Sequence, residues 1–236
     1  MKKVGILGGM GPLATVDLFE KIVLVTDAKK DQDHIPLIIN NIPQITDRTQ
    51  AILHKGKSPY PTLVTEAKKL QDMGAEILAI ACNTSYYYYD DLKKELEIPI
   101  LHMQKIVAKK LTHCSYKMPA ILATKGALEV GLYQKALKEE GLQYLEPKED
   151  QKDIIQDLIY QAIKGKNFHY PQEKIEEVFL ELKGQGADCF ILGCTELPLA
   201  KKIFHWKETC IDPTLEMAKE IVIQAGGSLD GKMETL

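Results

Sequence analysis

Two cysteines of this 236-residue chain occupy similar local settings. Each ends a short apolar run and precedes polar residues typical of a helix start, Asn83-Thr84-Ser85 after Cys82 and Thr195-Glu196 after Cys194. The positive end of a helix dipole stabilises a thiolate, whereas an unassisted thiol, with a pKa of about 8.5, is only about 3% ionised at neutral pH. These settings could produce a base or a nucleophile, although a buried structural thiol beside a helix cap fits each cysteine taken alone.

The sequence around the two cysteines repeats. Residues 74–82 (GAEILAIAC) can be laid over residues 186–194 (GADCFILGC) at an offset of 112 residues, and residues 3–8 match 119–124 at a similar offset. A hydrophobic core does not require a cysteine at the end of both strands. The repeat therefore favours a paired catalytic role, in which one thiolate removes a proton and one thiol supplies one.

Two charged residues suggest what such a pair would act on. Arg48 is the single arginine among 30 basic residues, in a loop that follows a predicted strand. A guanidinium grips a carboxylate with two parallel hydrogen bonds, which lysine does poorly, so Arg48 indicates a carboxylate-bearing substrate. Glu196 has two interpretations: it neutralises a helix start, or it orients a thiol or a substrate amine.

The glycine-rich loop at residues 8–15 (GGMGPLAT) leaves an alternative open. Glycines permit a tight strand-to-helix turn, and its spacing fits the dinucleotide-binding fingerprint. However, the end of the next predicted strand carries Asn40-Asn41 instead of the acidic residue that would hold a ribose. A dinucleotide-binding enzyme therefore remains an alternative based on a weak motif.

The elements that must position these residues follow an α/β pattern, because short apolar runs alternate with segments of helical period. We predict mostly parallel strands at residues 3–7, 37–41, 77–81, 100–102, 120–123, 189–192 and 209–211, and helices at 61–73, 85–96 and 152–164. The repeat predicts two domains, 1–102 completed by 207–236, and 103–206. Because ligands bind at the carboxyl ends of parallel strands, both cysteines would face one cleft.

The bulk properties exclude several classes of protein. The net charge of −3 with well-mixed acids and bases argues against a nucleic-acid partner. No apolar run approaches the roughly 20 residues that span a bilayer, so we expect no membrane association. The five cysteines are an odd number without paired spacing, which predicts a reduced, cytoplasmic protein. No cysteine or histidine spacing suggests a metal site. Residues 226–236 look like a flexible tail.

Three segments together resemble the aspartate/glutamate racemase family: residues 8–15, Cys82-Asn83-Thr84, and residues 192–196 (LGCTE). The likeness extends from residue 4 to about residue 215. It implies two pseudo-symmetric Rossmann-like α/β domains with the active site in the cleft between them, in a homodimer, and Cys82 and Cys194 as the acid/base pair. In the aspartate-specific branch an arginine and a lysine hold the side-chain carboxylate, and Arg48 and Lys164 stand at the matching positions.

The resemblance also implies the contacts to the rest of the substrate, with the amino-acid head group held by Met10, Asn83, Thr84 and Ser85, and with Thr124 and Thr195 nearby. The chain departs from the family pattern at Tyr86, where members often carry histidine, and at Ala127, where many carry a second hydroxyl. Both departures concern the breadth of substrates rather than the chemistry.

The sequence therefore predicts an isomerase that interconverts L- and D-aspartate by two-cysteine proton transfer, with no cofactor, since no pyridoxal-binding lysine motif is recognisable. Glutamate or broad-specificity amino-acid racemisation is the alternative within the family, beside hydantoin racemase and a maleate-isomerase-like reaction in which cysteine is a nucleophile. A non-catalytic sensor of acidic amino acids is the alternative outside enzymes.

Overall fold

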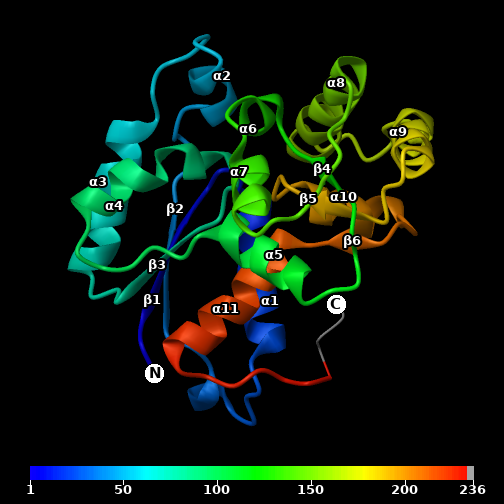
Figure 1. Cartoon of the computed structure of the whole chain (residues 1–236). Coiled ribbons are helices and arrows are strands. Elements are labelled where there is room, and N and C mark those ends of the chain that lie inside the picture. The colour runs from blue at the N-terminus through cyan, green and yellow to red at the C-terminus, as the bar shows by residue number, and fades with distance from the viewer. Residues whose placement is uncertain (233–236) are drawn as a thin grey trace. The chain divides into compact units, whose positions relative to one another are not determined.

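The computed structural model describes residues 1–232, which form two compact units (Figure 1). The first unit comprises Met1–Met103 and the segment from Thr214 onward, and the second comprises Gln104–Pro213. Each unit has a three-stranded sheet of its own.

The sheet of the first unit has the order β2-β1-β3, and all its strands are parallel. The central strand β1 (Val4–Gly8) is buried along its whole length, as expected for a parallel strand covered on both faces. It pairs with β2 (Leu37–Asn41) and β3 (Ile77–Ile80). The helices of this unit are α1 (Pro12–Val25), α2 (Arg48–Ile52), α3 (Tyr60–Asp72), α4 (Tyr89–Glu95) and α11 (Pro213–Ala225), with short 3-10 turns η1 (Asp31–Asp33) and η2 (Thr84–Tyr88).

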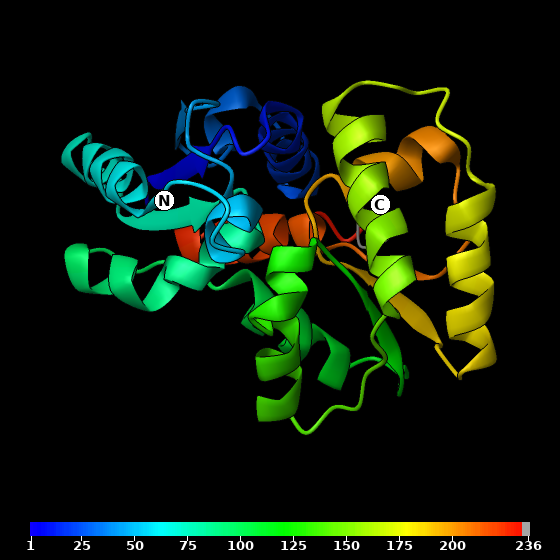
Figure 2. The ribbon, with the colours of Figure 1, turned by 90° about the horizontal axis from the view of Figure 1, so that it is seen from above.

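The second unit has a parallel sheet of order β4-β5-β6, from β4 (Pro119–Leu122), β5 (Cys189–Leu192) and β6 (Cys210–Ile211). Alternate residues of β4 and β5 face two separate apolar clusters, so the sheet is packed on both sides. Figure 2 shows helices on either side of these strands. The helices are α5 (Met103–Thr112), α6 (Lys125–Glu129), α7 (Leu132–Glu139), α8 (Glu149–Asp157), the π-helix η3 (Leu158–Lys164), α9 (Glu173–Gly184) and α10 (Leu197–Phe204).

The two sheets repeat one pairing scheme. The pair β1–β3 corresponds to the pair β4–β5, and in each pair the last paired residue of the second strand, Ile80 or Leu192, stands two positions before a cysteine. A parallel bridge from Leu78 to Ile100 extends the first sheet where β6 extends the second, and a bridge from Ala120 to Leu145 lies where β2 lies in the first. The predicted fold class, two pseudo-symmetric α/β domains with parallel sheets, is confirmed.

Several boundaries differ from those predicted. Residues 207–213, predicted to complete the N-terminal domain, belong to the second unit, because β6 pairs with β5 there. The predicted strand at 100–102 contributes the single bridge at Ile100. The predicted flexible tail is tied down in part: Leu229 bridges Thr26, and Asp230 donates its backbone N–H to Val25 at 2.9 Å. The remainder of that tail, residues 233–236, lies outside the described residues.

Within residues 1–232, no helix is both long enough and apolar enough to cross a membrane. The same residues contain no cluster of histidine, cysteine and carboxylate side chains arranged to hold a metal ion.

Candidate active site

The glycine loop after β1 is held by the side chain of Thr15, whose hydroxyl accepts the backbone N–H of Gly9 at 2.8 Å and donates to the carbonyl of Gly11 at 3.2 Å. Gly9 has a φ of +92°, and a Cβ there would lie 2.4 Å from the backbone of Ile42. Only glycine fits this position. The loop therefore places Met10 at the carboxyl end of β1.

Cys82 lies two residues beyond the end of β3 and is buried. The backbone N–H of Ala81 still bonds the carbonyl of Leu7 at 2.9 Å, so the chain follows β1 up to the cysteine. The segment after it is the 3-10 turn η2 before α4, not the continuous helix predicted for residues 85–96. Because a short turn aligns fewer peptide dipoles, the helix-dipole argument for Cys82 is weaker than the sequence suggested. Asn83, Thr84 and Ser85 are all buried in this turn.

Met10 joins two other predicted site residues of the first unit. The hydroxyl of Ser85 lies 3.3 Å from the sulfur of Met10. The guanidinium of Arg48 donates to the carbonyls of Met10 at 3.0 Å, Ile45 at 3.3 Å and Thr46 at 3.2 Å. Arg48 opens α2, which the side chain of Asp47 caps through the N–H of Gln50. The arginine therefore fixes the loops around Met10, a role that its carboxylate-binding interpretation did not include.

In the second unit, Gly193 lets β5 end close against β4. Its N–H donates to the carbonyl of Leu122 at 2.7 Å, and a Cβ on it would lie 2.9 Å from that oxygen. Cys194 follows, two residues past Leu192, and Thr124 stands two residues past Leu122, its partner in register. Thr124 caps α6 by accepting the N–H of Ala127 at 3.2 Å. Thr124 and Cys194 thus lie at the same edge of the sheet.

Glu196 connects three of the predicted residues. The thiol of Cys194 donates to its Oε2 at 2.9 Å, and the hydroxyl of Thr195 donates to the same oxygen at 3.3 Å. The ammonium of Lys164 lies 3.9 Å from its Oε1 and 4.4 Å from the ring centre of Tyr160. Of the two interpretations of Glu196, this contact favours the one in which it orients a thiol or a substrate amine, and the thiol is the group that it contacts.

Lys164 owes its position to the π-helix η3, which sequence periodicity did not reveal. The N–H of Gly165 closes a wide turn onto the carbonyl of Tyr160 at 2.8 Å. A Cβ on Gly165 would lie 2.6 Å from the carbonyl oxygen of Gln161. The glycine directly after Lys164 was the available sequence signal for an unusual turn at this position. Such π-helical turns often occur at functional sites.

Electrostatics favour the neutral form of Cys194. Burial raises the pKa of this thiol well above its usual range, the carboxylate of Glu196 raises it further, and Lys164 opposes both. At neutral pH this sulfur therefore carries its proton, so that it can act as an acid.

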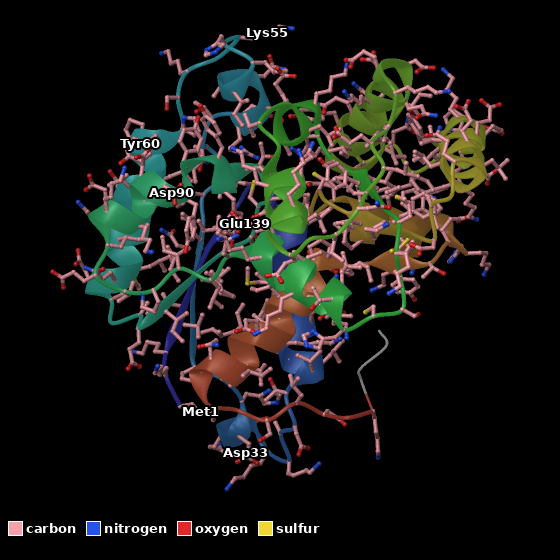
Figure 3. The ribbon with its side chains drawn as sticks, in the orientation of Figure 1. Met1, Asp33, Lys55, Tyr60, Asp90 and Glu139 are labelled. Carbon is pink, nitrogen blue, oxygen red and sulfur yellow. The ribbon has the colours of Figure 1, made fainter. Side chains whose placement is uncertain are left out.

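The predicted residues share one property, which is burial. Charged side chains such as Lys55, Asp90 and Glu139 lie on the outside (Figure 3). The predicted site residues are instead buried, apart from the half-buried Lys164. Burial of polar and charged groups is costly unless they are paired. Their gathering near the carboxyl ends of strands in each unit is therefore typical of a ligand site.

A family model described as Asp/Glu/Hydantoin racemase matches residues 7–221. The chain belongs to this racemase family. Family membership confirms the resemblance noted in the sequence, and it makes the chain an amino-acid racemase.

Relatives in this family differ in the substrates that their names give. The chain is 27% identical over 223 residues to the broad specificity amino-acid racemase RacX of Bacillus subtilis, with 93% of this chain and 96% of that protein covered. It is 31% identical over 139 residues to a glutamate racemase of Aquifex aeolicus, covering 58% of this chain and 52% of that one. The structure of Picrophilus torridus aspartate racemase superposes with a TM-score of 0.86 at 30% identity, covering 98% of this chain and 97% of that one.

Proposed function

We propose that this racemase interconverts L- and D-aspartate by moving a proton between Cys82 and Cys194, with no cofactor taking part. The observation that carries the proposal is the matched position of the two cysteines, each two residues past the end of a strand in the repeated pair. Racemisation needs a base on one face of the α-carbon and an acid on the other. Two matching strands, each followed by a cysteine, supply two such groups.

In the proposed reaction a thiolate removes the α-proton, and a thiol delivers its own proton to the opposite face. One S–H bond forms and the other breaks, so each turnover leaves the two cysteines with exchanged protonation. The proposal requires both sulfur atoms to reach one α-carbon. The α-proton of an amino acid is very weakly acidic, so the developing carbanion must be stabilised by preorganised donors in a site that excludes water. Candidates are the backbone and side chains of Asn83, Thr84 and Ser85, with the hydroxyls of Thr124 and Thr195.

Aspartate is favoured by the two cations and by structural similarity. Arg48 and Lys164 would hold the side-chain carboxylate, each cationic contact contributing about 1.5–3 kcal/mol to binding. That energy sets specificity and does not replace the acid/base chemistry. The 30% identity to Picrophilus torridus aspartate racemase over nearly the whole chain supports the same substrate.

Broad amino-acid specificity is the second candidate, and one observation favours it. Both cations have partners within the chain, since Arg48 bonds three carbonyls and Lys164 faces Glu196. A cation already neutralised within the chain discriminates less for a substrate carboxylate. The match to RacX over 96% of that protein supports this candidate.

The test is a substrate panel followed by chiral chromatography. L-aspartate, L-glutamate and two neutral amino acids are incubated separately with the purified chain, and the D-enantiomers are quantified. Aspartate turning over at least tenfold faster than the others supports the proposal, and comparable rates favour broad specificity. Absence of turnover on aspartate, with turnover on another amino acid, would overturn the substrate assignment.

The family resemblance adds two expectations to the proposed function. We expect a homodimer, which light scattering on the purified chain tests directly. We also expect a cytoplasmic enzyme, in keeping with five cysteines that are all free thiols in the structure.

A further inference from the structure

We propose that Glu196 holds Cys194 in its thiol form in the substrate-free enzyme, which makes Cys194 the resting acid and leaves the role of resting base to Cys82. This inference rests on the proposed two-cysteine function and deepens it. It assigns Glu196 as a positioning residue, acting through Cys194 rather than on the substrate.

The first step of the argument locates a proton. The Cys194 sulfur and the Glu196 Oε2 are 2.9 Å apart and both buried. Two anions at that distance would repel strongly in a poorly hydrated site. The contact therefore requires a proton on one of the two atoms.

The second step assigns the proton to sulfur. Thr195 donates its hydroxyl to the same carboxylate oxygen at 3.3 Å, and the ammonium of Lys164 lies 3.9 Å from the other oxygen. An ionised carboxylate only accepts hydrogen bonds, so it fits an oxygen that receives both the thiol and the hydroxyl beside a cation. Glu196 is thus the anion of the pair, and Cys194 is the donor.

The surroundings of Cys194 within its unit do not reverse this assignment. Burial raises the pKa of the Cys194 thiol most, the Glu196 carboxylate raises it further, and Lys164 and a backbone hydrogen bond from Glu196 lower it. The apolar cluster that includes Cys194 also involves two tyrosines, Tyr160 and Tyr170, and the hydroxyl of Tyr170 donates to Asp157 at 2.7 Å. Burial and the carboxylate together outweigh Lys164 and the backbone hydrogen bond, so the pKa of Cys194 stays raised.

The sequence repeat shows that a carboxylate two positions after the cysteine occurs in one half of the repeat and not in the other. The residue two positions after the cysteine is Glu196 in the second unit and Thr84 in the first. The segments match as strands, yet only one carries a carboxylate at that position. The two half-reactions are therefore unequal: a turnover that takes the proton from Cys194 leaves a thiolate beside the Glu196 carboxylate, and this state recovers its proton from solvent or in the reverse reaction.

The test is the pH dependence of alkylation, which reads the thiolate of Cys194 directly and does not depend on racemisation. The full-length enzyme is treated with iodoacetamide between pH 6 and 10, and labelling is quantified by peptide mass spectrometry, with Cys114 as an internal reference. Wild type is compared with Glu196→Gln, which removes the charge, and with Lys164→Met, which removes the cation. Glu181→Gln, a carboxylate of the same unit paired with Lys148 on the surface, is the matched control.

We expect the Cys194 profile of Glu196→Gln to move to lower pH by about one unit or more, that of Lys164→Met to move to higher pH, and that of Glu181→Gln to stay in place. If one variant folds poorly, the other still tests the effect of charge on Cys194, because each variant removes a different charge. A profile that Glu196→Gln leaves unmoved, or shifts of both variants in the same direction, would overturn the inference. Racemase assays on the same samples separate this outcome from failure of the proposed function. If the alkylation profiles shift as expected but the wild-type enzyme does not racemise aspartate, the proposed function is contradicted and the role of Glu196 is supported.

Discussion

The carboxyl ends of β3 and β5 present the same atom in two different chemical settings. Cys82 is followed by the short turn η2, in which asparagine and hydroxyl side chains are buried. Cys194 donates its S–H to Glu196, which in turn faces Lys164 from η3. The repeated fold thus supplies two sulfur atoms, and different neighbouring residues decide how each holds its proton. The difference teaches that structural symmetry of the strands does not make the two proton transfers equivalent.

Removing either sulfur should have the largest effect. We expect Cys82→Ala and Cys194→Ala each to lower kcat for racemisation at least 1000-fold, since one face of the α-carbon loses its acid or base. Each variant should retain α-hydrogen exchange with one enantiomer only, and the two variants should prefer opposite enantiomers. Exchange is followed by NMR in heavy water, and Cys114→Ala serves as the control. Unchanged racemisation in Cys82→Ala would end the two-base account.

Arg48→Lys should have the next largest effect, and it tests the first unit. Lysine cannot reproduce the three carbonyl bonds of the guanidinium or a two-pronged grip on a carboxylate. We expect KM for aspartate to rise about 10- to 100-fold, which corresponds to roughly 1.4–2.7 kcal/mol, with a smaller change in kcat. Steady-state kinetics measure both, and the exposed Lys55→Arg is the control. A wild-type KM would mean that Arg48 does not contribute to substrate recognition.

Gly165→Ala tests the corresponding support in the second unit. The added Cβ would lie 2.6 Å from the carbonyl of Gln161, so the π-turn that carries Lys164 must shift. We expect a loss of about 1–3 kcal/mol in the free energy of unfolding and a several-fold drop in kcat/KM. Gly184→Ala is the matched control, because no atom lies within 4 Å of a Cβ built there. Urea unfolding and kinetics on both variants measure the difference, and equal behaviour of the two would show that η3 tolerates the change.

The smallest effect concerns stability at alkaline pH, and it tests the second unit, which contains Cys189, Cys194 and Cys210, three thiols whose pKa is raised by burial. Burial raises the pKa of Cys210 to about 12 and that of Cys189 further. These thiols stay protonated in the folded state while those of the unfolded chain ionise above about pH 9, so the unfolded state binds fewer protons there. Their contribution to stability is complete below about pH 9 and declines as pH rises towards 12 and beyond, by up to about 1.4 kcal/mol per thiol and pH unit.

Urea unfolding at pH 8 and pH 10 checks this for wild type and Cys189→Ala. The variant should lose less stability than wild type between the two pH values, because it lacks one of the groups that titrate on unfolding. An identical loss in both proteins would show that Cys189 ionises as readily in the folded state as in the unfolded chain.

Much of the fold was predictable from local sequence. The apolar runs at 37–41 and 189–192 are strands with the predicted bounds, and the repeat of residues 74–82 at 186–194 correctly predicted two similar sheets. The run at 189–192 is encoded locally, because a buried parallel strand must be apolar on both faces. The assignment of residues 207–213 failed because it depends on which sheet β6 joins, and a two-residue strand carries little sequence signal for that choice.

The contacts between the candidate site residues could not be predicted from the sequence. Sequence reasoning named Cys194, Lys164 and Glu196 separately, but their linkage depends on the π-helix and on side-chain directions that periodicity does not encode. Arg48 was interpreted as a ligand for a carboxylate, and its bond to the carbonyl of Met10 could not be foreseen, since the two residues are 38 positions apart in sequence.

The most direct test of the two-base account is isotope incorporation at early times. Wild-type enzyme is incubated with L-aspartate in heavy water, and α-deuterium is measured separately in the D-aspartate formed and in the L-aspartate that remains. Because the thiol that protonates the product differs from the base that removed the proton, the account predicts one α-deuterium in nearly all of the D-aspartate and almost none in the residual L-aspartate. Deuterium appearing in the residual L-aspartate as fast as in the product would contradict it, because a single base would then be returning a solvent-exchanged proton to both faces.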